Sequence, residues 1–66
     1  MKINVSTFEL SYLIDSWIFN ERNRKIVKRK MIDGITFEKL AEEFELSTQQ
    51  VKTIVYKCQG IISLHL

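Results

Sequence analysis

Proline is absent from the 66 residues, and glycine occurs only at positions 34 and 60. Turns must therefore come from these two glycines and from Ser, Thr, Asn and Asp, whose side chains hydrogen-bond to nearby backbone groups. The single cysteine, Cys58, excludes an internal disulfide and favours a reducing compartment, so we expect a cytoplasmic protein. Cys58 and the single His65 fall short of the four ligands of a structural zinc site, and we predict neither a metal nor a cofactor.

Long apolar runs are also missing, since the longest contain two or three residues, and we expect no membrane partner. A chain of 66 residues forms one domain with a thin core, which is poorly suited to a deep catalytic pocket. It has no Gly-rich phosphate loop, no paired-carboxylate site and no nucleophile with a neighbouring base. We therefore predict that the protein is not an enzyme.

Apolar residues recur with helical periodicity in four segments, and each segment follows a residue that can cap a helix: Ser6, Asn20, Thr36 or Ser47. Ser6 with Glu9 and Ser47 with Gln50 have the spacing of capping boxes. The predicted helices cover residues 7–19, 21–33, 37–44 and 48–59. Gly34 is expected in the left-handed conformation after the second helix, and Gly60 is expected to end the fourth. The pattern predicts an all-α fold, with residues 1–66 forming one small four-helix domain.

The two ends of the chain are apolar. Residues 61–66 form either a short strand, from the alternation of Ile62, Leu64 and Leu66, or a ragged helical continuation. Ile3 and Val5 alternate in the same way. These ends either complete the core of the monomer or pair two copies into a homodimer.

Phe8, Trp17 and Phe19 recur at helical spacing and are expected in the core rather than on a base-stacking surface. Cys58 is expected to be a small buried apolar residue, and His65 a surface residue.

The third and fourth segments have the outline of a helix-turn-helix, in which a short helix, a tight turn and a Ser-capped second helix follow one another. Ala41 is small where the two helices must pass closely, and Leu46 is placed to fill the turn. Val51 and Ile54 then return to the core from the second helix.

Five short motifs reinforce this outline: Glu21-Arg22-Asn23-Arg24, Gly34-Ile35-Thr36, Leu40-Ala41-Glu42-Glu43, Leu46-Ser47 and Val51-Lys52. Together they make residues 20–59 resemble region 4 of bacterial sigma factors and the related output domains of response regulators. The resemblance implies sequence-specific binding of double-stranded DNA in transcription regulation.

The chain departs from this family at Glu45, where glycine is common in the bend. A left-handed non-glycine residue costs about 1–2 kcal/mol. Either the bend differs here or the domain tolerates strain.

If the fourth helix enters a major groove, its outward residues contact base edges. The candidate base-reading residues are Thr48, Gln49, Lys52, Thr53 and Tyr56. Gln49 carries the donor and acceptor needed to bind adenine, and Lys52 can reach a guanine edge or a phosphate. For each residue taken singly, a merely solvated helix face is an equal alternative. As a set they favour DNA contact, because polar uncharged side chains are gathered where surface helices usually carry Glu and Lys.

Six basic residues lie between positions 22 and 30 without an acid among them. Such a stripe attracts phosphates by releasing condensed counterions, although charged runs are also common on solvated helix faces. The candidate phosphate contacts are Arg22, Arg24, Lys25, Lys28, Arg29, Ser47 and Lys57. Four glutamates gather between residues 38 and 45, so the third helix should face away from DNA or toward a basic protein surface. The net charge of +2 therefore conceals a polarised chain.

A second hypothesis belongs to another functional class. The same fold could serve as a protein-interaction adaptor that does not read DNA, either an accessory factor docking on RNA polymerase or an inhibitor of a regulator. The family resemblance implies this partner as well, since sigma region 4 binds the polymerase.

Overall fold

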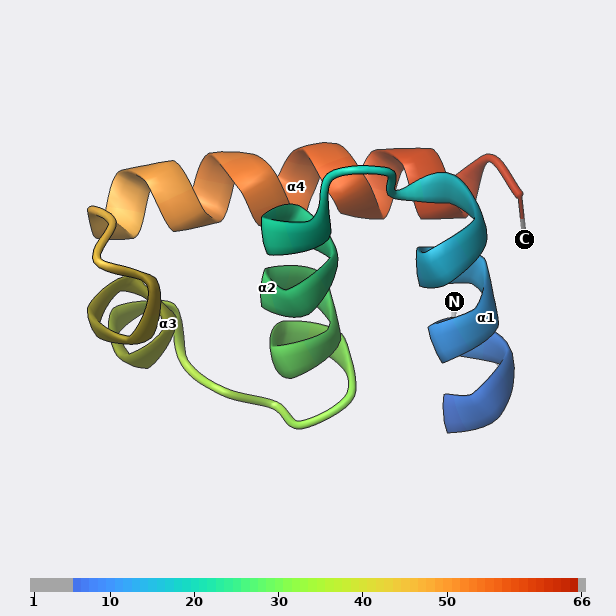
Figure 1. The fold of residues 1–66 in the computed structure, drawn as a ribbon, viewed down its shortest axis with the longest axis horizontal. Coiled ribbons are helices and arrows are strands. Elements are labelled where there is room, and N and C mark those ends of the chain that lie inside the picture. Colours follow the sequence, from blue (N-terminus) through green and yellow to red (C-terminus); the bar gives the residue numbers. More distant parts are fainter. Residues whose placement is uncertain (1–5, 66) are drawn as a thin grey trace.

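The computed structural model describes residues 6–65, which contain four helices and no strand. The helices are α1 (Thr7–Trp17), α2 (Glu21–Met31), α3 (Phe37–Phe44) and α4 (Thr48–Ser63). Figure 1 shows α4 running along one side of the molecule, with α3, α2 and α1 packed in turn beneath its beginning, middle and end. The predicted all-α fold is confirmed.

Each helix begins at its predicted capping residue. The side chains of Ser6, Asn20, Thr36 and Ser47 accept hydrogen bonds from the backbone N–H three residues later, at 3.1, 3.0, 3.2 and 3.1 Å. Gln50 completes the capping box of α4, because its Oε1 accepts from the backbone N–H of Ser47 at 2.9 Å. Such caps contribute about 1 kcal/mol each and set where the helices begin.

The core consists of two clusters along α4. The first buries Ile14, Ile18, Val27, Cys58 and Ile62, and the second buries Ile26, Leu40, Ala41, Val51 and Val55. Two features connect them: the half-buried Ile54 packs against both clusters, and the adjacent Ile26 and Val27 of α2 each belong to one. Burial of Ala41 at 8% exposure lets α3 lie close to α4, as its small size predicts.

Helices α1 and α2 each end two residues earlier than predicted. At the end of α1, Ile18 is extended with φ −106° and ψ 105°, and its carbonyl accepts a hydrogen bond from Arg24 Nε at 3.0 Å. Arg24 thereby satisfies a carbonyl that a longer helix would have paired internally. Gly34 has a φ of 71°, the left-handed conformation predicted for the connection after α2.

The prediction that Gly60 ends α4 is wrong, because the helix continues through Gly60 to Ser63. A helical glycine costs about 1 kcal/mol relative to alanine, whereas burying an isoleucine contributes about 1.5–3 kcal/mol. Ile62 is only 1% exposed in the first cluster, so its burial outweighs that cost. The strand alternative is therefore wrong for residues 61–65, and the helical continuation holds. Ile3, Val5 and Leu66 lie outside the described residues.

The aromatic residues of α1 are more exposed than predicted. Phe8 and Phe19 are 83% and 78% exposed, so the expectation that they lie in the core is wrong. At 100° per residue Phe8 lies about 120° around α1 from the buried Ile14, whereas Phe19 follows the extended Ile18 in the connection between α1 and α2. Trp17 is 40% exposed and belongs to neither core cluster, so its core prediction is wrong as well; its ring stacks on that of His65, with centroids 3.5 Å apart.

Glu45 adopts the left-handed conformation in the turn between α3 and α4, with φ 55° and ψ 45°. The following backbone N–H, of Leu46, donates to the carbonyl of Ala41 at 2.9 Å and closes the bend. The turn therefore keeps the geometry that favours glycine and carries the strain of a non-glycine residue.

Candidate nucleic-acid interface

The outward side of α4 carries a polar ridge, which we define as Gln49, Thr53 and Tyr56. All three are exposed, on the side of the helix opposite the buried Val51 and Val55. No Asp or Glu occurs between residues 48 and 63, so this helix has no side-chain charge that would repel phosphates. The ridge is therefore a surface on which a polyanion can lie.

The side chains of the adjacent residues Gln49 and Gln50 differ in their hydrogen bonds. Gln50 is occupied by the capping box, whereas the Gln49 side chain makes no hydrogen bond to another described residue. The Thr53 hydroxyl donates to the backbone carbonyl of Gln49 at 3.0 Å, and the lone pairs of the hydroxyl oxygen remain able to accept. The Gln49 amide therefore keeps its full bonding capacity available to a base edge.

The other predicted base-reading residues lie around the ridge. Thr48 is half-buried at the first position of α4, and Lys52 is half-buried along one edge. Among the predicted phosphate contacts, Lys57 is exposed on the same helix. Ser47 uses its hydroxyl oxygen as the helix cap, and its hydroxyl proton remains able to donate to a phosphate.

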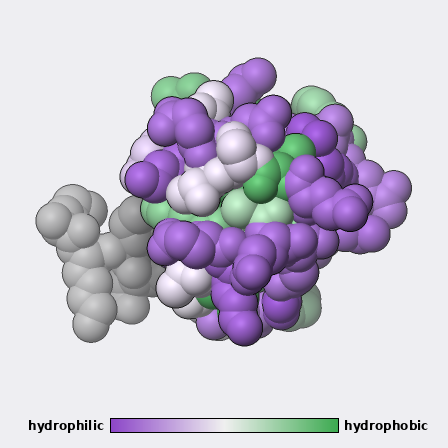
Figure 2. Space-filling model, turned by 90° about the vertical axis from the view of Figure 1, so that its left-hand side faces the viewer, coloured by the Kyte–Doolittle hydropathy of each residue, from purple (hydrophilic) through white to green (hydrophobic). Residues whose placement is uncertain are grey.

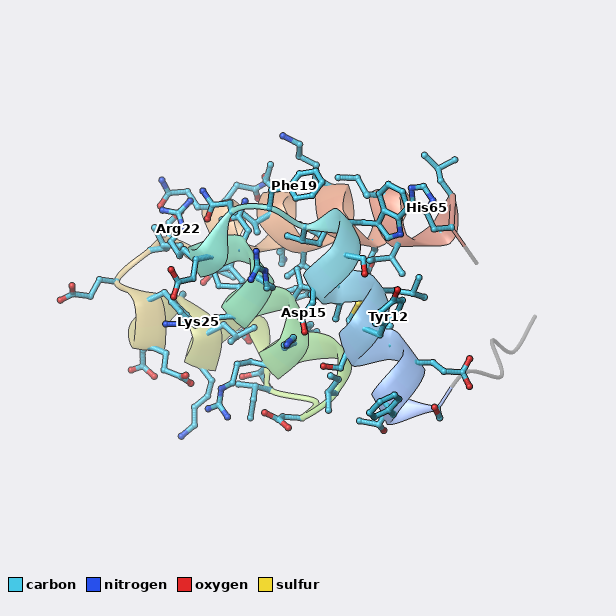
Figure 3. All side chains as sticks on the ribbon, turned by 45° about the vertical axis from the view of Figure 1, so that its right-hand side comes forward. Tyr12, Asp15, Phe19, Arg22, Lys25 and His65 are labelled. Carbon is cyan, nitrogen blue, oxygen red and sulfur yellow. The ribbon has the colours of Figure 1, made fainter. Side chains whose placement is uncertain are left out.

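Arg22 is the basic residue of α2 that reaches the beginning of α4. A shallow depression of about 340 Å³ lies between them. It is lined by Arg22, Leu46, Ser47, Gln49, Gln50, Thr53 and Ile54. Figure 3 shows Arg22 and Lys25 on the side of α2 away from α1. Arg22 therefore places a positive charge along one edge of the ridge.

Three other members of the basic run, Arg24, Lys28 and Arg29, make contacts that hold the helices in place. Lys28 Nζ lies 2.7 Å from Asp15 Oδ1 and so connects α2 to α1. Arg24 donates to the carbonyls of Ile18 and Phe19, at 3.0 and 3.4 Å. These contacts compensate the charge of Lys28 and occupy the guanidinium of Arg24, which leaves both less suited to phosphate binding than the sequence predicts.

Arg29 connects α2 to α3 through a bidentate pair with Glu43, at 3.1 and 2.8 Å, and also contacts Asp33 at 3.2 Å. The hydrogen bond from Arg29 lowers the pKa of the Glu43 carboxyl, and the same bond raises the pKa of the guanidinium. Lys25 makes only a loose pair with Glu21 at 3.7 Å and stays largely exposed. The run is acid-free in sequence, but its acidic partners come from α1, α3, the following turn and the first residue of α2.

A cluster that the sequence analysis did not single out surrounds Phe37. Lys30 Nζ lies 4.4 Å from the centre of this ring, and Lys52 Nζ lies 5.7 Å from it. Tyr56 meets the ring edge-on, with centroids 5.9 Å apart. Side chains from α2, α3 and α4 therefore converge here. The spacing of Lys52 and Tyr56, four residues apart on one helix, is the only sequence signal that indicates it.

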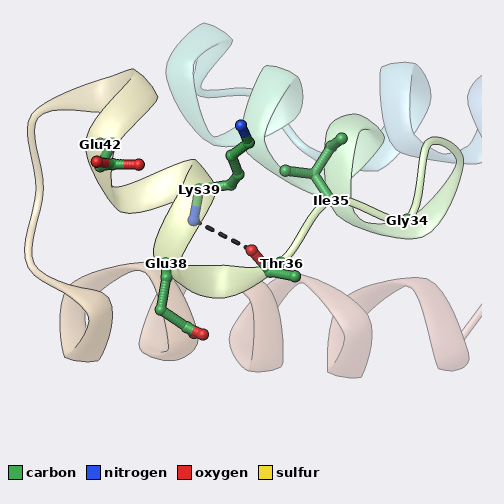
Figure 4. A pocket seen from close by; sticks show the side chains of 6 residues that line it. All are labelled: Gly34, Ile35, Thr36, Glu38, Lys39 and Glu42. Atoms are coloured by element: carbon green, nitrogen blue, oxygen red, sulfur yellow. Dashed lines mark hydrogen bonds between the residues drawn. The ribbon is translucent and has the colours of Figure 1, made fainter.

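The acidic residues of α3 lie on a different surface. Glu38 and Glu42 line a shallow depression of about 390 Å³ beside Gly34 and Lys39, shown in Figure 4. Figure 2 faces the end of the molecule formed by α3 and the beginning of α4, where hydrophilic residues cover most of the surface around a narrow apolar band. The depression presents two carboxylates against one ammonium, which disfavours a phosphate there.

Cys58 is buried at 3% exposure, as predicted, and burial raises the pKa of its thiol. Among residues 6–65, no group of three or more His, Cys, Asp or Glu side chains is arranged to hold a metal ion. No described helix combines the length and the apolar character needed to cross a membrane.

Comparisons with protein-family models, with curated proteins and with solved structures find no match to this chain. The likeness to sigma region 4 therefore rests on the motifs of the chain itself.

Proposed function

We propose that this protein is a sequence-specific DNA-binding protein of the helix-turn-helix type, similar to sigma region 4, that acts in transcription regulation in the cytoplasm. The observation that carries the proposal is the acid-free, exposed polar ridge of α4 beginning directly after the left-handed turn at Glu45. In this arrangement α3 and the turn present the N-terminal part of α4 to a major groove.

Within the proposal, Gln49 is the principal base-reading residue because its amide is free to make a bidentate contact with adenine. Thr53 and Tyr56 extend the contact along the ridge, with Thr48 at its beginning. Arg22, Lys57 and the hydroxyl of Ser47 contact phosphates. Arg24, Lys28 and Arg29 act mainly by holding α1, α2 and α3 in place.

The decisive measurement is the affinity of the chain for random-sequence duplex DNA over a range of salt concentrations, followed by selection of bound sequences from a random pool. We expect binding at low salt that weakens steeply as salt rises, and an enriched sequence motif. Gln49→Ala should relax the preference at one position of that motif. Gln59→Ala is the matched control, because it removes the same side chain ten residues later on α4, and should leave the motif unchanged. Absence of binding at low salt would exclude DNA as the ligand.

A second candidate function, the protein-interaction adaptor, is favoured by the exposed aromatic residues of the α1 region. Phe8, Tyr12 and Phe19 are 83%, 67% and 78% exposed, which leaves three aromatic rings available for contact with another protein. On this hypothesis they bind a transcription protein such as RNA polymerase, or a second copy of the chain. Changing all three to serine should abolish binding to purified polymerase while leaving DNA affinity intact. Light scattering at high concentration separates a homodimer from a monomer.

A further inference from the structure

The polar ridge of α4 has a basic group along each of its edges. Successive residues on a helix are rotated by about 100°, so Lys52 lies to one side of the line through Gln49, Thr53 and Tyr56. Arg22 of α2 lies on the other side, in the depression that it shares with Gln49 and Thr53. The ridge is therefore flanked by positive charge on both sides.

The basic group on the Lys52 side comprises two lysines at one aromatic ring. Lys30 and Lys52 lie 4.4 and 5.7 Å from the centre of Phe37, and both are half-buried. The negative face of an aromatic ring attracts an ammonium group, which holds these flexible side chains in place. Both ammonium groups therefore lie within 6 Å of one ring centre, where a bound anion would be attracted by both charges.

Charge compensation distinguishes these lysines from the rest of the basic run. Among residues 6–65, none of the ion pairs includes Arg22, Lys30 or Lys52, whereas Lys25, Lys28 and Arg29 all have carboxylate partners. Arg22, Lys30 and Lys52 are therefore uncompensated charges that flank the ridge, whereas Arg24, the other member of the run without an ion pair, is occupied by the carbonyls of Ile18 and Phe19.

We propose that Lys30 and Lys52, held at the ring of Phe37, form a site for DNA backbone phosphate on the edge of the ridge opposite Arg22. The inference rests on the proposed function and deepens it. A major groove about 12 Å wide admits one helix of about 10–12 Å diameter, so the phosphates of the two strands lie on either side of that helix. Arg22 contacts one strand, and the Phe37 cluster contacts the other. Lys52 is then a phosphate contact rather than a base-reading residue.

The first test compares Lys30→Gln with Lys28→Gln, using one duplex selected from the random pool. Lys28→Gln is the matched control on the same helix, because its charge is already compensated by Asp15. We expect Lys30→Gln to reduce the slope of log affinity against log salt by about 1. Lys28→Gln should leave that slope unchanged. Circular dichroism of each variant checks that the four helices are retained.

A second test identifies the strand that each group contacts. Neutral methylphosphonate linkages are placed singly along either strand, and the affinity of each duplex is measured. In Lys30→Gln, linkages on one strand should lose their effect, and in Arg22→Gln those on the opposite strand should.

Three outcomes would overturn the inference. Equal salt slopes for Lys30→Gln and Lys28→Gln, or loss of sensitivity on the same strand for Arg22→Gln and Lys30→Gln, reject it while DNA binding stands. Failure of the unmodified protein to bind any duplex rejects the proposed function as well.

Discussion

The two parts of the molecule that pack along α4 differ in what they expose. Around the first half of α4, α3 presents charged residues. Of the described residues in that part, Tyr56 is the only large apolar one that is exposed. Around the second half, α1 and the residues that follow α1 and α4 leave five large apolar side chains exposed: Phe8, Tyr12, Trp17, Phe19 and Leu64. The first part resembles a surface for a charged ligand, whereas the second resembles a surface for a protein. DNA binding and partner binding are therefore compatible in one chain.

The core clusters beneath these two surfaces should nevertheless unfold together, which is the largest effect we predict. Leu40→Ala in the second cluster and Ile14→Ala in the first should each destabilise the domain by about 2–5 kcal/mol, because both side chains are fully buried. Urea unfolding followed by circular dichroism and by Trp17 fluorescence provides a global probe and a probe in α1. Both probes should shift equally in Leu40→Ala, since Ile54 connects the clusters. An unchanged Trp17 transition in that variant would show two independent units.

The two glycines should respond to alanine with opposite signs. Gly34→Ala should destabilise the protein by about 1–2 kcal/mol, because an L side chain is strained at a φ of 71°. Gly60→Ala should stabilise it by about 0.5–1 kcal/mol, because the position is helical and a Cβ there meets no atom within 4 Å. Thermal unfolding midpoints measure both. A loss of stability in Gly60→Ala would show that the end of α4 is less helical than described.

The turn between α3 and α4 offers a smaller effect. Glu45→Gly should stabilise the domain by up to about 1 kcal/mol, because it removes the left-handed strain at φ 55° at the cost of greater freedom in the unfolded chain. Glu45→Ala serves as the control and should bring no gain, since alanine is strained there too. If both variants gained the same stability in urea, the destabilising effect of Glu45 would come from its charge and not from the strain of its backbone.

The smallest predicted effect concerns acid stability near α3. Arg29 lowers the folded-state pKa of Glu43 below the ordinary value of 4.5, so the pair stabilises the fold above that value. The contribution is lost as pH falls through the lowered pKa. Glu43→Gln should therefore be slightly less stable at pH 7 and should lose less stability below pH 4.5 than the parent chain. Urea midpoints over a pH series measure this, and parallel curves would exclude the pair as a contributor.

Local sequence predicted the features of this fold that depend on neighbouring residues. The caps at Ser6, Asn20, Thr36 and Ser47 set the beginnings of all four helices, because each cap acts on a backbone group only three residues away. The end of α4 could not be predicted in this way, because it depends on Ile62 packing into a core cluster that α1 and α2 also form, far away in the sequence.

In the candidate interface, too, local features could be predicted from the sequence and contacts between helices could not. The periodicity of α4 predicted which side of the helix faces outward, and the structure agrees at Gln49, Thr53 and Tyr56. Charge compensation could not be predicted in this way. The partners Lys28–Asp15 and Arg29–Glu43 join different helices, and only the packing of those helices brings them together.

The side-chain caps have a consequence for how this chain could be rearranged. With no proline available, three of the connections end in a residue that is bonded to the helix that follows it: Asn20, Thr36 and Ser47. Each of these helices and its capping residue therefore form one local unit, whose beginning does not depend on the rest of the fold. Grafting residues 47–63 onto another scaffold should transfer the ridge in its native register, whereas a graft beginning at Thr48 would leave the first turn free to fray.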